Sequence, residues 1–212
     1  MSARRTLLDA VSIRDRLAGT EMPADPLAVD LSRTGGRLPM RLAGLRLDEL
    51  RPAGVLIPII ERREALTVLL TERSADLKQH AGQVSFPGGG MEPHDEHILA
   101  TALRETHEEV GIEPALVNVA GYLKPMPTIT GYAVTPVVGL VSERFELSID
   151  PVEVETAFEV PLEFLMDAGN EEHSEREIDG VVYPIITFHF EDHRIWGATA
   201  GIIAMLRELL IV

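Results

Sequence analysis

The chain has 212 residues, and its 34 acidic and 19 basic side chains give a formal net charge of −15. This excess of acidic groups argues against a nucleic-acid partner, because phosphate backbones are bound by clustered Lys and Arg side chains. The absence of Cys excludes disulfides, thiolate metal sites and cysteine nucleophiles. Any catalysis would therefore depend on oxygen and nitrogen groups. A hydrophobic fraction of 45% suffices for one large core, which favours a single globular domain.

The apolar segments predict neither a signal peptide nor a membrane span. Asp9 and Asp15 interrupt the N-terminal stretch before a signal-peptide core could form. The most apolar stretches, 54–60 and 201–212, are well below the roughly 18 apolar residues that a spanning helix needs. We therefore expect a cytoplasmic protein with no membrane partner.

The expected elements, in chain order, combine several strands with few helices. Residues 7–18 have the spacing of a helix, and the Pro- and Gly-containing segment 20–50 predicts an extended arm that packs on the body or on a second subunit. Strands are expected at 53–60 and 66–71, which form a hairpin, and at 83–86, which ends at Pro87 and three glycines; a helix is expected at 95–110, strands at 117–122, 133–141, 156–160 and 182–190, and a closing helix at 197–210. This mixture favours an α+β domain over residues 51–212, with residues 1–50 compatible with a homodimer or a capped monomer.

The helix expected at 95–110 carries three glutamates along one edge. On a wheel of about 100° per residue, Glu105, Glu108 and Glu109 fall within an arc of about 100° beside the apolar stripe. Like charges at this spacing repel, and Glu109 lies inside the apolar border, where desolvation makes its charge costlier. Arg104 can pair with Glu108, but one guanidinium does not offset three carboxylates, so Mg²⁺ or Mn²⁺ is predicted to bind here.

Two other interpretations of this helix compete with a magnesium or manganese site: a solvated acidic face and a zinc site. Glutamates in a last helical turn are also common on solvated faces, and three of them alone do not exclude that. His94, His97 and His107 could be read as zinc ligands, but they diverge from the carboxylate arc on the wheel, which favours surface histidines.

The wider segment 88–112, GGGMEPHDEHILATALRETHEEVGI, resembles the box of the Nudix hydrolase family. The matching positions are Gly90, Glu96, Arg104, Glu105, Glu108, Glu109, Gly111 and Ile112. Thr106 departs from the usual aliphatic residue, but its methyl group can pack and its hydroxyl can bond the preceding turn.

This resemblance implies a Nudix fold, in which a mixed β-sheet is sandwiched between α-helices. It also implies that Glu105, Glu108 and Glu109 hold Mg²⁺ or Mn²⁺, that Arg104 orients a glutamate, and that Glu96 fixes the loop between the glycines and the helix. The proton acceptor stays open among Glu105, Glu108 and Glu153.

A second segment, LLTERSADLKQHAGQVSFPGG at 69–89, resembles the signature that precedes the box in coenzyme A pyrophosphatases of that family. The resemblance implies hydrolysis of coenzyme A or an acyl-CoA to 4′-phosphopantetheine, or its acyl form, and adenosine 3′,5′-bisphosphate. Arg73 and Lys78 would bind the substrate, with Lys78 in place of the usual arginine. Lys78 and Lys124, the only lysines, would supply local positive charge for an anionic substrate.

Two alternatives remain open from the residues. A Nudix hydrolase could act on another nucleoside diphosphate derivative, such as ADP-ribose or a dinucleotide. A non-catalytic nucleotide-binding module could also keep the fold, although the complete set of acidic residues argues against it.

Overall fold

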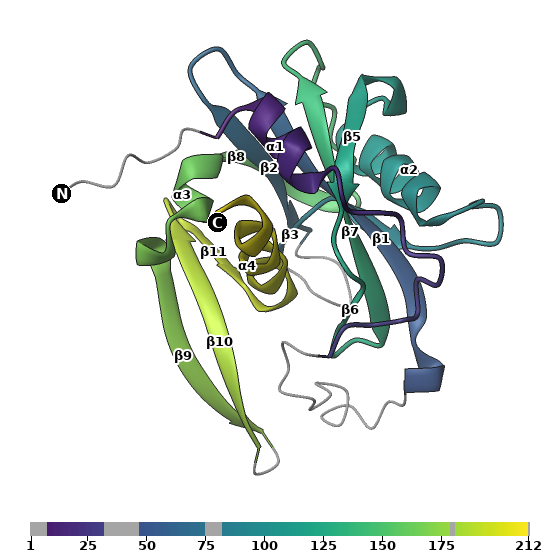
Figure 1. The fold of residues 1–212 in the computed structure, drawn as a ribbon, viewed down its shortest axis with the longest axis vertical. Helices are drawn as coiled ribbons and strands as arrows, with labels where there is room; N and C mark the ends of the chain where they lie inside the picture. Colours follow the sequence, from purple (N-terminus) through teal and green to yellow (C-terminus); the bar gives the residue numbers. More distant parts are fainter. Residues whose placement is uncertain (1–7, 32–46, 75–81, 179–180, 212) are drawn as a thin grey trace.

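The computed structural model describes residues 8–31, 47–74, 82–178 and 181–211, and its elements form two β-sheets with helices packed on them (Figure 1). In chain order the elements are α1 (Ala10–Leu17), η3 (Leu47–Glu49), β1 (Arg51–Glu61), β2 (Leu66–Arg73), β3 (Val84–Ser85), β4 (Gly88–Gly90), α2 (Ile98–Val110), η4 (Pro114–Leu116), β5 (Val117–Tyr122), β6 (Met126–Pro127), β7 (Tyr132–Ser142), β8 (Val154–Pro161), α3 (Leu162–Met166), η5 (Ala168–Asn170), β9 (Glu171–Ile178), β10 (Val181–Phe190), β11 (His193–Trp196) and α4 (Gly197–Leu210).

The larger sheet is mixed and has the strand order β3-β2-β1-β7-β5, and in addition β4 pairs with β1, β6 with β7 and β8 with β2. Its centre is the parallel pair β1 and β7, and β1 and β2 form the predicted antiparallel hairpin. A central strand is apolar on both faces because helices cover both. Accordingly, Leu56 packs in the cluster that contains Ala102 of α2, whereas Ile57 packs with residues of α1 and α4. The expected α+β class, with a mixed sheet between helices, is confirmed.

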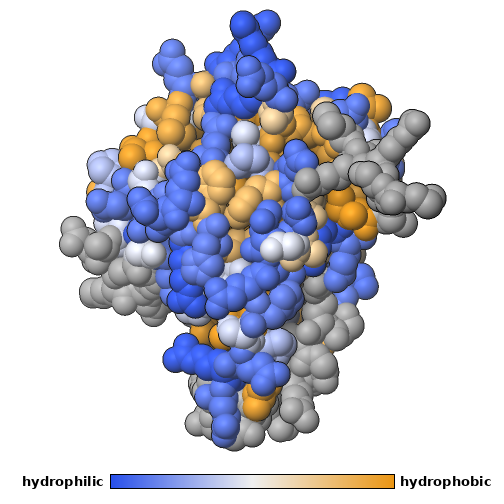
Figure 2. Space-filling model, turned by 90° about the vertical axis from the view of Figure 1, so that its left-hand side faces the viewer, coloured by the Kyte–Doolittle hydropathy of each residue, from blue (hydrophilic) through white to orange (hydrophobic). Residues whose placement is uncertain are grey.

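The smaller sheet, β11-β10-β9, is antiparallel and contains two strands that the sequence pattern missed, β9 and β11. In Figure 1 the β9–β10 hairpin extends away from the larger sheet. Residues 172–177 of β9 are all exposed, so no apolar alternation marks them as a strand. Figure 2 shows the face of the molecule on this side, where hydrophilic residues predominate around a smaller apolar group near the middle.

The glycines at 88–90 are a second correction: β3 ends before Pro87 as expected, but the glycines then form a strand of their own, β4. They pair with β1, with Val55 opposite Gly88 and Ala53 opposite Gly90. A Cβ at Gly88, whose φ is +148°, would lie 2.4 Å from the Gly54 carbonyl oxygen. Only glycine permits this approach of two backbones, so the run that looks like a strand breaker forms a strand here.

The N-terminal segment packs on the body as far as the structure describes it. Helix α1 begins with a capping box, in which Asp9 accepts a hydrogen bond from the Ser12 N–H at 2.8 Å and Ser12 Oγ accepts one from the Asp9 N–H at 3.0 Å. Ile13 and Leu17 are fully buried in the main core. Residues 32–46 of the expected arm lie outside the described part of the chain. Among the described residues, no helix combines the length and the apolarity that crossing a bilayer requires.

Candidate active site

Helix α2 lies on the larger sheet with its carboxylates along one border of the buried face. It begins at Ile98, three residues later than expected, because the His97 side chain caps it by accepting the Ala100 N–H at 3.1 Å. It ends at Gly111, whose φ of 76° is typical of a C-terminal cap. Thr106 is fully buried, and its hydroxyl donates to the Ala102 carbonyl at 2.6 Å, as the sequence predicts.

Glu109 is the most buried of the three carboxylates, with an exposed fraction of 3%. Its Oε2 accepts the Gly88 N–H at 3.1 Å, and its Oε1 lies 3.5 Å from Arg73 Nη1. Burial is the main reason that the pKa of Glu109 is raised from 4.5 to about 8, and the charges of Glu105 and Glu153 add to the effect. The predicted position of Glu109 inside the apolar border is therefore confirmed.

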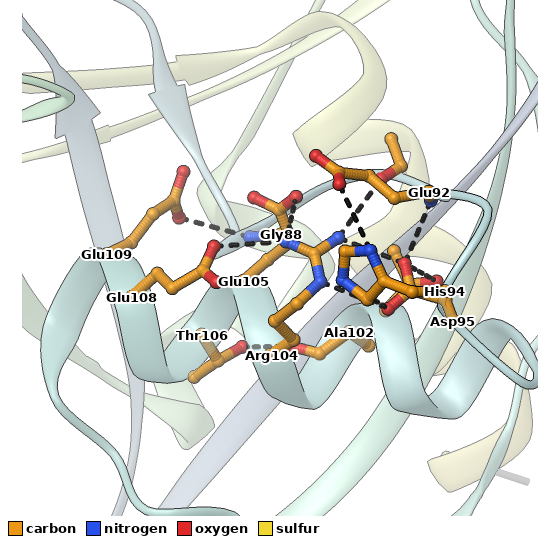
Figure 3. A network of polar contacts seen from close by, with 12 residues as sticks. Gly88, Glu92, His94, Asp95, Ala102, Arg104, Glu105, Thr106, Glu108 and Glu109 are labelled. Atoms are coloured by element: carbon orange, nitrogen blue, oxygen red, sulfur yellow. Dashed lines mark hydrogen bonds and ion pairs between the residues drawn. The ribbon is translucent and has the colours of Figure 1, made fainter.

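Arg104 is the hub of the polar network on α2 (Figure 3). Its Nη1 contacts Glu105 Oε1 at 2.9 Å and Glu108 Oε2 at 3.0 Å, which confirms the predicted pair with Glu108. Its Nε and Nη2 form two parallel bonds to the carboxylate of Asp95, both 3.0 Å long, and Nη2 also donates to the Gly90 carbonyl at 3.3 Å. One guanidinium thus connects the glycine strand, the loop before the helix and two of the glutamates.

Asp95 is a site residue that the sequence analysis did not single out, and it corrects the role expected of Glu96. The Asp95 side chain is 3% exposed and also accepts the Glu92 N–H at 2.9 Å and the Thr101 hydroxyl at 3.0 Å. The hydrogen bonds from Arg104 are the main cause that holds the pKa of Asp95 well below its usual range. Because Asp95 makes these hydrogen bonds and Glu96 is exposed, Asp95 is the residue that holds this loop.

Glu105 lies directly over the glycine strand. A Cβ on Gly89 would be 2.4 Å from the Glu105 carboxyl carbon, so the absence of a side chain there makes room for the carboxylate. Burial raises the pKa of Glu105, and the charges of Glu108 and Glu153 act in the same direction, while Arg104 opposes them. Strand β4 therefore packs directly against the acidic edge of α2.

Glu153 reaches the same region from the segment before β8. Its carbonyl accepts the Ser74 N–H at 2.9 Å, next to Arg73, and its charge contributes to the raised pKa values of Glu105 and Glu109. The structure therefore places a fourth carboxylate close to the acidic helix. Glu153 stays one of the three candidate proton acceptors.

The charge balance of the site is compatible with a hard divalent cation. Three carboxylates provide the oxygen donors that Mg²⁺ and Mn²⁺ prefer. Burial is the main cause of the raised pKa values of Glu105 and Glu109, and the charges of the neighbouring carboxylates add to it, so a bound cation would stabilise the charged form of both side chains. Within the described ranges, no three acidic or histidine side chains are already arranged around one point as ligands; Glu105 and Glu108 contact Arg104, and Glu109 contacts Arg73 and Gly88.

The other candidate residues contact side chains other than the three glutamates, or lie outside the described residues. Lys78 belongs to the segment 75–81, which the structure does not describe. Lys124 forms an ion pair with Asp30 at 3.1 Å. His94 and His107 are exposed and face Glu92 and Glu113, in agreement with their interpretation as surface residues.

The chain is similar in sequence to known proteins of one family. The NUDIX domain family matches residues 50–189. A protein from Photorhabdus laumondii is 44% identical over 161 residues, which cover 76% of this chain and 86% of that protein. A protein from Escherichia coli O7:K1 is 43% identical over 161 residues, which cover 76% of this chain and 82% of that protein. Both bear the name "Uncharacterized Nudix hydrolase NudL". Among solved structures, the NUDIX domain of Shewanella oneidensis NrtR complexed with ADP ribose aligns with a TM-score of 0.44 at 17% identity, over 65% of this chain and 86% of that one.

Proposed function

The chain belongs to the NUDIX domain family of hydrolases, and on this premise we propose that it cleaves the pyrophosphate bond of coenzyme A or an acyl-CoA. The products would be 4′-phosphopantetheine, or its acyl form, and adenosine 3′,5′-bisphosphate. Mg²⁺ or Mn²⁺ would be required.

The observation that carries this proposal is the contact of the upstream motif with the acidic helix. Arg73, near the start of the motif, and Gly88, near its end, both contact the carboxylate of Glu109. The upstream motif and the box, which adjoin in the sequence, therefore contribute to one site. A motif that resembles the coenzyme A signature is thus in a position to influence which diphosphate is accepted.

Each residue of the site has a role that follows from its contacts. Glu105, Glu108 and Glu109 would hold the divalent ion, which when bound neutralises the diphosphate and lowers the pKa of a coordinated water. Arg104, fixed by Asp95, orients Glu105 and Glu108.

The remaining roles are binding of the diphosphate and acceptance of the proton of the attacking water. The half-buried Arg73 presents a guanidinium fork, which suits the oxygens of a diphosphate. Glu105, Glu108 and Glu153 are the groups from which the proton acceptor is drawn. Gly88–Gly90 let backbone and substrate approach the carboxylates closely.

A substrate screen with mass identification of both products tests this proposal. Purified protein is incubated with Mg²⁺ or Mn²⁺ and coenzyme A, an acyl-CoA, NADH, ADP-ribose or a diadenosine polyphosphate, with EDTA as the metal-free control. We expect coenzyme A compounds to be cleaved fastest. Glu105→Gln should lower the rate by orders of magnitude, whereas the exposed Glu96→Gln control should not.

Other outcomes of this screen would replace the proposal. Preferred cleavage of ADP-ribose or of a dinucleotide would keep the hydrolase and refute the coenzyme A substrate. Binding of nucleotides without cleavage under any metal condition would identify a non-catalytic module.

A further inference from the structure

A cavity of about 390 Å³ lies on the other side of β2 from the carboxylates of α2. Its volume falls in the range of roughly 300–1,000 Å³ that is usual for small-molecule sites. It is lined by Glu72, residues 82–84, Asp192, His193, Arg194 and Trp196. These residues come from β2, from the segment leading into β3, and from the turn and strand at β11, so the cavity lies between the edge of the larger sheet and the smaller sheet.

The cavity is close in the chain to the candidate active site. Glu72 and Arg73 are neighbours on β2, but Glu72 contacts His193 whereas Arg73 contacts Glu109, so their side chains point to opposite faces. Residues 82–84 of the cavity wall precede Gly88 of β4 by only a few positions. The cavity and the carboxylates therefore lie on the two faces of the paired strands β2 and β3.

The wall of the cavity is held in place by stacking and hydrogen bonding. The His193 ring stacks on Phe158 with centroids 3.6 Å apart and planes 5° from parallel, and its Nδ1 lies 3.2 Å from Glu72 Oε2. Next along β11, the guanidinium of Arg194 lies over the indole of Trp196, 5.1 Å from the ring centroid. This half-buried indole with its exposed arginine is a flat surface of the kind on which nucleobases stack.

The charges of the lining decide which part of a nucleotide suits it. Among the described residues of the lining, Glu72 and Asp192 are acidic and Arg194 is the one permanent cation, which makes this part of the cavity unfavourable for a phosphate group. Carboxylates accept hydrogen bonds, which suits a ring that carries an exocyclic amine. A flexible chain of amides and methyl groups would gain little from the stacking surface.

We propose that this cavity binds the nucleobase of the substrate, with Trp196 and Arg194 as the stacking surface and Glu72 or Asp192 as the acceptor of the base's exocyclic amine. For the coenzyme A substrate proposed above, on which this assignment rests, the base is adenine. Arg73 then receives the diphosphate on the opposite face of β2, and the pantetheine half stays outside the cavity.

Trp196 is the only tryptophan of the chain, so its fluorescence reports on the cavity without any turnover. The full-length protein in EDTA is titrated with adenosine 3′,5′-bisphosphate, with inosine 3′,5′-bisphosphate and with 4′-phosphopantetheine. We expect saturable quenching by the adenosine compound and none by 4′-phosphopantetheine. Inosine 3′,5′-bisphosphate should bind at least about tenfold more weakly, because its oxo group faces a carboxylate in place of a donor.

Variants test the same assignment through kinetics. Arg194→Ala should weaken adenosine 3′,5′-bisphosphate about tenfold and raise KM for coenzyme A by a similar factor with kcat kept. Arg63→Ala, on a side chain 91% exposed in the β1–β2 turn, is the matched control and should change neither value. Trp196→Phe should retain most of kcat/KM, whereas Trp196→Ala should not.

The results separate this inference from the proposed function. Absence of quenching by the adenosine compound, equal quenching by 4′-phosphopantetheine, or equal behaviour of Arg194→Ala and Arg63→Ala would overturn the base pocket even if coenzyme A is hydrolysed. Adenine-selective quenching in a protein that cleaves ADP-ribose but not coenzyme A would support the pocket and refute the coenzyme A substrate.

Discussion

Replacement of Glu109 by Gln should make the protein more stable at neutral and alkaline pH while it abolishes most of its activity. The pKa of Glu109 is raised from 4.5 to about 8, so the folded protein binds this proton more tightly than the unfolded chain does. The free energy of unfolding of the wild-type protein must therefore fall as pH rises from about 4.5 to 8. The variant has no such group and should lack this part of the pH dependence.

The size of the effect follows from the shift. At about 1.4 kcal/mol per pKa unit, the shift from 4.5 to about 8 destabilises the fully charged form by on the order of 5 kcal/mol, and by about 3 kcal/mol at pH 7. The glutamine keeps an oxygen for the Gly88 N–H, and the favourable effect of Arg73 on the charged form is already contained in the raised pKa. We expect a gain of about 3 kcal/mol at pH 7.

Urea denaturation in EDTA at about pH 5, 7 and 8.5 measures this gain. The two proteins should be similar near pH 5 and diverge as pH rises, with Glu96→Gln, on an exposed residue, following the wild type. Coenzyme A hydrolysis by Glu109→Gln should fall by orders of magnitude. Parallel stability profiles, or a variant that is less stable than wild type at pH 8.5, would refute the burial of a costly charge at this position.

Three further predictions concern the surroundings of the carboxylates. Asp95→Asn should lower the free energy of unfolding, measured by urea denaturation, by about 2 to 3 kcal/mol, because it removes the charged bidentate partner of Arg104. Glu96→Gln should change this free energy by no more than about 0.5 kcal/mol. Equal losses in the two variants would contradict the role of Asp95 in fixing the loop before α2. Gly89→Ala should lower kcat at least about tenfold, because its Cβ would lie 2.4 Å from the Glu105 carboxylate. Gly90→Ala, whose Cβ would have its nearest contact at 3.5 Å, should retain activity. Similar kcat values for the two variants would contradict the close packing of Glu105 on β4. Millimolar Mg²⁺ should raise the free energy of unfolding at pH 8 by about 1 to 3 kcal/mol, and by less in Glu109→Gln. If calorimetry shows no Mg²⁺-dependent stabilisation of the wild-type protein, a cation site at the carboxylates is refuted.

The local features of this protein were predictable from the sequence because they depend on short-range periodicity. The helical repeat is enough to place Glu105, Glu108 and Glu109 on one edge and Glu109 inside the apolar border. The same reasoning predicts Gly111 as the cap and the full extents of β5 and α4. Each of these depends on residues within a few turns of one another, where the geometry of the backbone is known in advance.

The features that the sequence did not indicate depend on contacts between separate elements. Asp95 lies before the helix, so no helical wheel relates it to Arg104, and only the folded loop brings the two together. The glycines of β4 form a strand because β1 approaches them too closely for any side chain. The polar β9 is a strand because β10 supplies its hydrogen bonds, and the cavity at Trp196 exists because two sheets meet there. Periodicity describes one segment at a time, whereas the distance between segments is decided by how the whole chain packs.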